Sequence, residues 1–329
     1  MKNKSLKARP YQLMCIFCRS SEGFAKSPAG KKLKRLADEI ARDPDVPLTL
    51  VCNVSGNYSY QNPGRKEDTP EGSLFNVKRD IDILHKMGLV PGTTMPARFL
   101  VAKLLETVES SVGICGYGQK DSMAWKGCRK AGSGDYESAR KKGAAFLVPA
   151  RPLAECKETK KTSAVKMYKA KCLMLRPHHL MCMACFSAGP RGNGPIEADN
   201  LYEAIDMIRM NPRIPVKLHQ GPCMVCPPCA SYLPCKKICI GGRSMALRDE
   251  KKDLDVLQKL DMKYGDVMAA IDLYRKLFKA VYSTRQICGF GDGIPRSYEW
   301  NGCGMDGLPA YDKARKEGMK IPGLKVKSK

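Results

Sequence analysis

Apolar residues recur along the first half of the chain in short segments of helix-like and strand-like pattern. Residues 31–42 have the periodicity of an amphipathic helix, and 46–52 form a short apolar run that we predict to be a strand. Residues 143–148 are a further strand candidate. A later segment carries apolar side chains at the i, i+1, i+4 and i+8 positions of one helix face: Leu100, Val101, Leu104 and Val108.

The second half repeats this series in the same order. A helix pattern at 198–210, a strand-like run at 214–219 and an apolar helix stripe from Leu273 to Val281 follow one another as in the first half. Over 125–143 against 300–318, nine of nineteen positions are identical, and the offset between the copies grows only from 167 to 175. These matches predict a tandem duplication.

The predicted fold is α-rich and of the α+β class, with two pseudo-symmetric domains whose loops carry cysteines. Each half would have three or four amphipathic helices and one or two short strands. We expect a first repeat at 1–150, a second repeat at 172–329, and between them a Lys-, Thr- and Glu-rich segment at 151–171 that is a linker or a surface helix. The second repeat holds an additional cysteine-rich insertion at 223–239.

Sixteen cysteines are the chemical signature of this chain. The basic N-terminus is followed by no apolar signal region, and no run of about 18 apolar residues predicts a membrane span. We therefore expect a cytoplasmic protein, in which cysteines hold metal more often than they form disulfides. Disulfides and mostly free buried thiols are the alternatives.

Four cysteine positions recur in both halves, and a fifth pair matches after a three-residue shift. Ordinary buried cysteines have no reason to recur in order, because Ala or Val would fill the same volume. We predict one four-thiolate site in each half, with Cys18 and Cys185 as alternates. The predicted ligands are Cys15, Cys52, Cys115 and Cys128 in the first half, and Cys182, Cys223, Cys288 and Cys303 in the second.

The insertion adds a dense run that begins with a CxxCxxC pattern. It is similar to a ferredoxin-type run but has five residues, not three, before the fourth cysteine. We predict a further [4Fe–4S] site here, with a zinc knuckle as the alternative. Its ligands would be Cys226, Cys229, Cys235 and Cys239, and Cys226 is also an alternate for Cys223.

Scattered single cysteines suit a cluster held by several elements better than zinc, whose ligands usually come as short-range pairs. We therefore favour two or three [4Fe–4S] clusters over zinc.

The stretch 176–185 combines Arg-Pro-His-His with two cysteines and is identical to 9–18 at six of ten positions. The two histidines stand where the first copy has Tyr and Gln. His178 and His179 are therefore candidates for a proton donor or a metal ligand that distinguishes the second half. Arg176, which both copies retain, is a candidate contact to the cofactor.

Arg-Pro-His-His-Leu-Met-Cys at 176–182 resembles the opening motif of the RPHHLLC-motif family of bacteria and archaea (domain of unknown function 1284). Gly221-Pro222 with a following cysteine, and the terminal Cys288, Trp300 and Cys303, match that family's later segments. The resemblance covers about 172–305 and implies an iron–sulfur-binding protein with no established reaction. The first half joins it only through the internal repeat.

The formal charge of +24 suits an acidic partner protein, with nucleic acid as a weaker possibility because the excess is spread along the chain. We expect an oxygen-sensitive iron–sulfur redox protein that transfers electrons or belongs to a redox enzyme system. One alternative is a zinc-dependent nucleic-acid-binding protein. The other is an iron–sulfur enzyme whose cluster has an open site beside His178 and His179.

Overall fold

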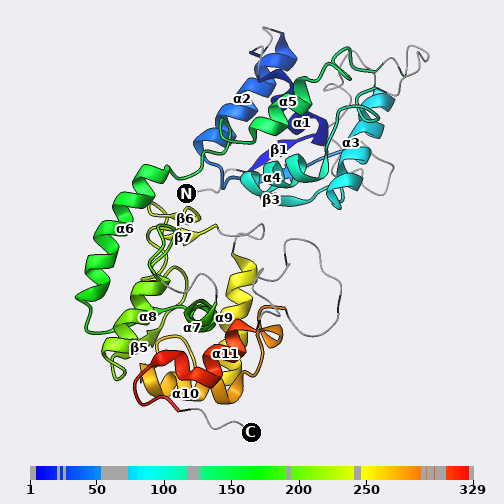
Figure 1. Ribbon diagram of the computed structural model, residues 1–329. Helices are drawn as coiled ribbons and strands as arrows, with labels where there is room; N and C mark the ends of the chain where they lie inside the picture. The colour runs from blue at the N-terminus through cyan, green and yellow to red at the C-terminus, as the bar shows by residue number, and fades with distance from the viewer. Residues whose placement is uncertain are drawn as a thin grey trace. The chain divides into compact units, whose positions relative to one another are not determined.

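The computed structural model divides the chain into two compact units, Met1–Pro149 and Ala150–Lys329 (Figure 1). It describes residues 5–20, 23–24, 27–52, 73–116, 125, 127–189, 194–240, 246–289, 294, 300 and 309–325. The predicted helix-rich α+β fold is confirmed. Over the described residues, none of the helices combines the length and apolar character needed to cross a bilayer.

The first unit places its helices around a small three-stranded sheet. Its elements are β1 (Leu6–Ala8), α1 (Pro10–Arg19), α2 (Pro28–Arg42), β2 (Pro47–Leu50), α3 (Ser73–Met87), β3 (Thr94–Pro96), α4 (Ala97–Thr107) and α5 (Asp135–Lys142). Strand β2 lies at the centre, parallel to β1 and antiparallel to β3. The apolar faces of α1, α2 and α4 cover the buried side chains of this sheet and form one core.

The second unit follows the same order of helices and strands and adds one helix before its first strand and a two-stranded hairpin after its second. Its elements are α6 (Leu153–Tyr168), β4 (Leu173–Leu175), α7 (Pro177–Ala188), α8 (Leu201–Met210), β5 (Pro215–Leu218), β6 (Tyr232–Leu233), β7 (Ile238–Cys239), α9 (Leu247–Leu260), β8 (Val267–Ala269), α10 (Ala270–Ala280), α11 (Ala310–Glu317) and the 3₁₀ helices η4 (Thr284–Gln286) and η6 (Gly318–Lys320). Strand β5 pairs parallel with β4 and antiparallel with β8, as β2 does with its neighbours.

The sequence pattern located most of these elements but missed the shortest. The helix patterns at 31–42 and 198–210 correspond to α2 and α8, and the strand-like runs contain β2 and β5. The prediction of a strand at 143–148 is wrong, because these residues form turns. The outer strands of both sheets have three residues each, too few for an alternating pattern to be recognised.

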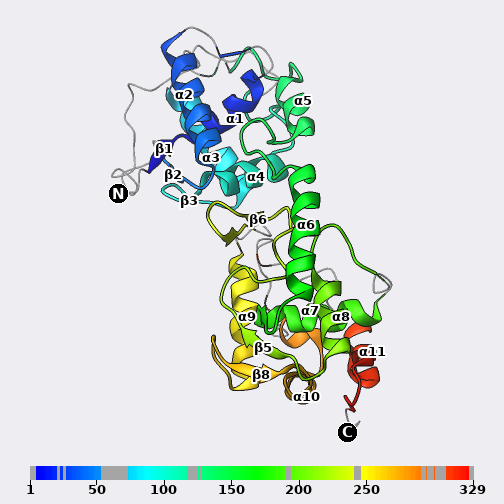
Figure 2. The same cartoon turned by 90° about the vertical axis from the view of Figure 1, so that its left-hand side faces the viewer.

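The segment predicted to be a linker or a surface helix forms helix α6. This helix belongs to the second unit and packs against α8 (Figure 2). Cys156 and Met167 are the buried residues of α6, and the rest of its side chains are polar or partly exposed. Such a weak apolar face explains why hydrophobic periodicity did not reveal this packing.

A buried Arg–Asp ion pair lies at the start of α1 in the first unit and at the start of α7 in the second. In the first unit, Arg9 Nε donates to Asp80 Oδ2 over 2.7 Å, and both side chains are 0% exposed. The other oxygen, Asp80 Oδ1, accepts from the backbone N–H of Tyr11 over 2.9 Å. The carboxylate thus satisfies one of the N–H groups that the first turn of α1 leaves without an intrahelical partner.

The second unit repeats this arrangement with Arg176 and Asp253. Arg176 Nε lies 2.8 Å from Asp253 Oδ2, and the backbone N–H of His178 donates to Asp253 Oδ1 over 3.0 Å. Asp80 lies on α3 and Asp253 on α9, so in each unit the pair connects two helices across the core.

We predict that Asp80→Asn lowers the free energy of unfolding by about 3–5 kcal/mol, because it leaves the buried Arg9 guanidinium without its counter-charge. Urea denaturation followed by circular dichroism measures this change. The matched control is Asp82→Asn, which breaks the partly exposed Lys78–Asp82 pair on the same helix and should cost less than about 1 kcal/mol. Equal effects of the two substitutions would contradict the prediction.

Candidate metal centres

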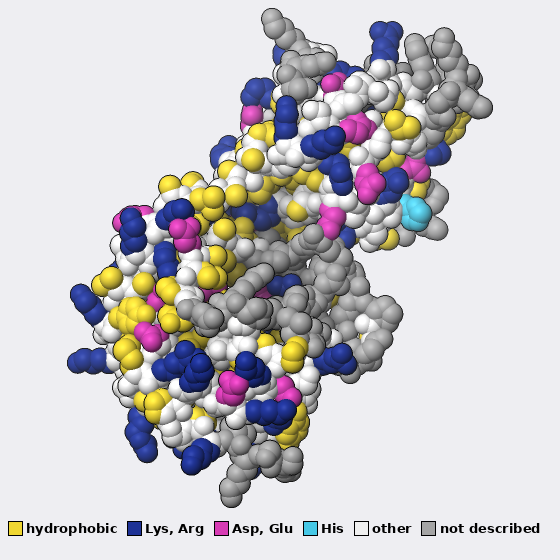
Figure 3. All heavy atoms as spheres, in the orientation of Figure 1, with side chains coloured by type: hydrophobic (Ala, Val, Ile, Leu, Met, Phe, Trp, Pro, Cys, Tyr) yellow, Lys and Arg dark blue, Asp and Glu magenta, His cyan; other side chains and the backbone are white. Residues whose placement is uncertain are grey.

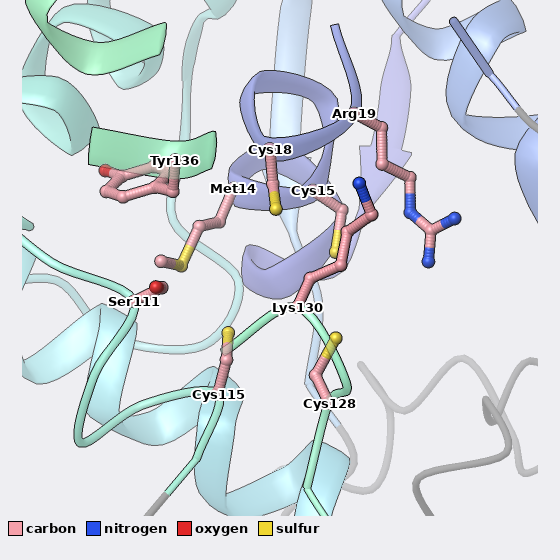
Figure 4. Close-up of a pocket in the computed structure, with 9 residues that line it drawn as sticks. All are labelled: Met14, Cys15, Cys18, Arg19, Ser111, Cys115, Cys128, Lys130 and Tyr136. Atoms are coloured by element: carbon pink, nitrogen blue, oxygen red, sulfur yellow. The ribbon is translucent and has the colours of Figure 1, made fainter. Parts of the chain in front are cut away.

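Four cysteine thiols of the first unit line a single cavity. Figure 4 shows the sulfur atoms of Cys15, Cys18, Cys115 and Cys128 pointing toward one another. The first two come from α1, and the other two come from the loops after α4, about one hundred residues later in the sequence. We call these four residues the first-unit quartet.

Helix geometry and loop hydrogen bonds position the quartet. Cys15 and Cys18 are three residues apart on α1, so their side chains leave the same face of the helix. The backbone N–H of Cys115 donates to Ser111 O over 2.8 Å, which closes the turn before that thiol. The N–H of Cys128 then donates to Cys115 O, also over 2.8 Å, so the two loops are tied directly at their cysteines.

Two glycines let these loops approach each other. A Cβ at Gly116 would lie 2.7 Å from Cβ of Ala131, closer than side chains tolerate. Gly127 has a φ of +73°, and a Cβ there would lie 3.2 Å from Cys115 O. The glycines beside Cys115 and Cys128 are therefore required by packing as well as by any contact to a bound group.

The rest of the cavity wall is apolar on one side and basic on the other. Met14 and Tyr136 contribute to the wall, and the Tyr136 hydroxyl donates to Val108 O over 2.8 Å. Arg19 and Lys130 also line the cavity (Figure 4). Two cations beside four thiols offset the negative charge that the sulfurs acquire when they lose their protons.

Burial favours the protonated form of two quartet thiols, Cys18 and Cys115, when nothing is bound. It raises the pKa of both Cys18 and Cys115 to about 12, and neighbouring cysteines add to the rise. Because the ligand form of cysteine is the thiolate, binding a metal or cluster here must release protons. These thiols therefore suit a permanent cation better than nucleophilic catalysis.

Cys52, a predicted ligand of the first half, does not line this cavity; Cys18, the predicted alternate, does. Cys52 is fully buried, and burial raises its pKa to about 12, with Asp80 and Arg9 as its charged neighbours. It therefore lies beside the ion pair at the start of α1.

Three described cysteines of the second unit occupy places in the chain that correspond to members of the quartet. Cys182 and Cys185 lie on α7, and Cys288 follows η4 with its N–H donating to Thr284 O over 2.6 Å. Tyr311 corresponds to Tyr136: its hydroxyl donates to Val281 O over 3.2 Å. Burial raises the pKa of Tyr311, and the nearby Cys185 and Cys288 sulfurs contribute to that rise. Cys303, the predicted fourth ligand, lies outside the described residues.

A different group forms around Cys223. His179 Nδ1 lies 3.1 Å from Cys223 Sγ, and Cys226 Sγ lies 4.0 Å from the same sulfur. The ligand atoms of these three residues all lie within 4.8 Å of one another, which holds for no other such group in the described part of the chain. The sequence analysis had assigned Cys223 and Cys226 to separate sites; the structure brings them together and adds His179.

The remaining cysteines of the insertion are spread around this group. Cys229 Sγ accepts from the backbone N–H of Ser231 over 3.4 Å, and burial raises its pKa. Cys235 is exposed on the turn between β6 and β7. Cys239 lines a separate cavity of about 290 Å³ together with Arg176 and Pro222. The described structure therefore does not gather Cys226, Cys229, Cys235 and Cys239 at one point.

His178 is hydrogen-bonded to Asp253 and is not a member of the His179, Cys223 and Cys226 group. Its Nδ1 lies 2.7 Å from Asp253 Oδ1. Burial, with a smaller contribution from the neighbouring His179, lowers the pKa of His178 to about 4, so the ring is neutral at pH 7. Arg176, the predicted cofactor contact, directs its guanidinium to Asp253, while its backbone N–H is a donor to Cys223 Sγ.

Arg151 holds the loop between Cys226 and Cys229. Its Nη1 donates to the carbonyl oxygens of Pro227 and, over 3.3 Å, of Cys229, and its Nε donates to Glu155 over 2.7 Å. The side chain is only 3% exposed. Sequence analysis missed this residue, because a single arginine at the start of a polar segment gives no signal of its partners.

Comparison with known proteins identifies no relative of this chain: family models, curated proteins and solved structures all gave no match. The resemblance to the RPHHLLC-motif family therefore stays a prediction from the sequence.

We predict that Arg151→Ala exposes the Cys226–Cys229 loop. Each hydrogen bond to a charged group contributes about 1.5–3 kcal/mol, so alkylation of Cys229 in reduced, metal-free protein should accelerate at least about tenfold. Mass spectrometry of maleimide-labelled peptides follows this rate. Lys157→Ala, which removes an exposed cation from the helix that follows Arg151, is the control and should leave the rate unchanged.

Proposed function

We propose that this protein binds cysteine-ligated iron–sulfur clusters and transfers electrons through them. The observation that carries the proposal is the convergence of the four first-unit thiols on one cavity (Figure 4). Four cysteine thiolates are the usual protein ligands of a [4Fe–4S] cluster. In this protein they come from one helix and two loops.

The separation of the thiols supports a cluster over a single ion. A tetrahedral zinc ion with bonds of about 2.3 Å holds its sulfurs about 3.8 Å apart. No three sulfurs of the first-unit quartet lie within 4.8 Å of one another. In a [4Fe–4S] cluster each thiolate binds a different iron atom, so the four sulfurs are farther apart than those around a single ion.

The two units support a second cluster and a duplicated origin. Both have the same order of elements, the same sheet pairing and the same Arg–Asp pair. We propose that they arose by tandem duplication, with Cys182, Cys185, Cys288 and Cys303 as the second ligand set. Two clusters in one chain would form a short electron relay.

The charge of the protein supports an acidic redox partner. Arg19 and Lys130 line the first cavity, and cations near a cluster favour its reduced form. The formal charge of +24 would also attract an acidic protein and accelerate docking at low salt. We place the protein in the cytoplasm, where thiols remain reduced.

A single divalent ion at the quartet is the second candidate. The observation that favours it is the cavity volume of about 20 Å³, which admits one ion, whereas a cluster requires the walls to move outward. Nucleic-acid binding receives less support, because the Lys and Arg side chains are dispersed over the visible face and form no continuous patch (Figure 3).

We predict that full-length protein purified without oxygen is brown, contains iron and acid-labile sulfide in equal amounts, and gives an EPR signal after reduction. Cys18→Ser should lose about one cluster's iron and sulfide per chain, because it removes a ligand of the quartet. Cys52→Ala is the matched control and should retain both. A colourless protein that contains only zinc at the quartet would refute the proposed function.

A further inference from the structure

We propose that the second unit binds one Zn²⁺ ion through His179, Cys223 and Cys226, at a site separate from the cysteine clusters. The fourth coordination position would be open to water or a small molecule. The proposal goes beyond electron transfer, because it gives the second unit a Lewis-acid centre that the first unit lacks.

The distances fit a single ion. Cys223 Sγ and Cys226 Sγ are 4.0 Å apart, close to the separation of about 3.8 Å that two zinc–sulfur bonds of about 2.3 Å impose at a tetrahedral angle. His179 Nδ1 is 3.1 Å from Cys223 Sγ. Zinc–nitrogen bonds are about 2.0–2.1 Å long, so a small rotation of the imidazole completes the three-ligand geometry.

The backbone holds the two thiols in place before any ion binds. The N–H of Cys226 donates to Cys223 O over 3.0 Å and closes the turn between them. Residues inside this turn are anchored too: Met224 N donates to Met174 O over 3.2 Å, and Asn200 N donates to Val225 O over 3.0 Å. The turn is therefore attached to β4 and to the start of α8.

The first unit has a different residue at the critical position. Gln12 takes the place of His179, and its Oε1 accepts from the backbone N–H of Arg9 over 2.9 Å, which stabilises the start of α1. In the second unit the His179 ring does not accept this backbone hydrogen bond, and its Nδ1 faces Cys223 instead. The zinc site is thus specific to the second unit.

Cys229 is the residue that would close the site, and the structure keeps it away. Its sulfur accepts from Ser231 N–H, and its carbonyl is held by Arg151. The neighbouring His178 is engaged with Asp253. Three protein ligands and one open position are typical of catalytic zinc, in which the metal polarises a bound water or carbonyl.

A cavity beside the site offers room for a small polar molecule. It has a volume of about 290 Å³ and is lined by Arg176, Pro222 and Glu250, among others. Pro222 precedes Cys223 in the chain, and the backbone N–H of Arg176 contacts Cys223 Sγ. A molecule in this cavity would therefore contact Pro222 and Arg176, which adjoin Cys223 through the chain and through a hydrogen bond.

The test measures metal binding by the full-length chain under nitrogen. Zinc and iron are quantified, and zinc affinity is measured against a chromogenic chelator; Co²⁺ serves as a spectroscopic substitute whose absorption reports tetrahedral thiolate coordination. We expect His179→Gln to weaken zinc binding at least about 100-fold. The first unit accommodates Gln at this position, so this variant should fold, and circular dichroism checks that it does.

Cys229→Ser and Cys235→Ser are the matched controls and should keep zinc affinity within about threefold. Cys223→Ser and Cys226→Ser should abolish the Co²⁺ thiolate absorption. The proposal is overturned by unchanged zinc affinity in His179→Gln, by equal loss in Cys229→Ser, which indicates a closed four-ligand site, or by iron with sulfide at these residues. Zinc retained by a chain that holds no iron would refute the proposed electron transfer and leave this site standing.

Discussion

The positions of helices α1 and α7 each depend on one buried carboxylate. In both units an aspartate from a later helix receives an arginine guanidinium on one oxygen and a backbone N–H of the helix start on the other. Burying such a pair carries a large desolvation cost, which the attraction between the charges and the additional hydrogen bond offset. Once the pair has formed, the start of the helix is fixed relative to the core, and so are the directions of its thiols.

The cysteines fall into two kinds of environment within this shared frame. Those of the first-unit quartet face a cavity, and burial holds the thiols of Cys18 and Cys115 in their protonated form. At Cys223 burial also acts to raise the pKa, but hydrogen bonds from the Cys226 thiol and from the Arg176 backbone outweigh it, so the pKa lies below its ordinary value. The same hydrogen bond raises the pKa of the Cys226 thiol, so binding a cation to this pair of cysteines still releases a proton.

Long periodic helices and the recurring cysteines could be predicted from the sequence, because both leave a repeated pattern. The choice between Cys18 and Cys52 could not, because it depends on which face of α1 turns toward the loops of Cys115 and Cys128. The grouping of His179 with Cys223 depends on strand pairing between β4 and β5, which brings residues 44 positions apart together. The role of Arg151 could not be predicted either, because it binds backbone carbonyl oxygens, which every residue type has.

The carboxylate of Asp80 accepts from the main-chain N–H of the second residue of α1, and that of Asp253 from the second residue of α7. A hydrogen bond to the main chain can form whichever side chain the residue carries. The second and third residues of the helix can therefore differ without moving the helix, as Tyr11 and Gln12 differ from His178 and His179. In a scaffold of this kind a single substitution can add or remove a potential metal ligand, so two units of the same architecture can present different sets of ligands.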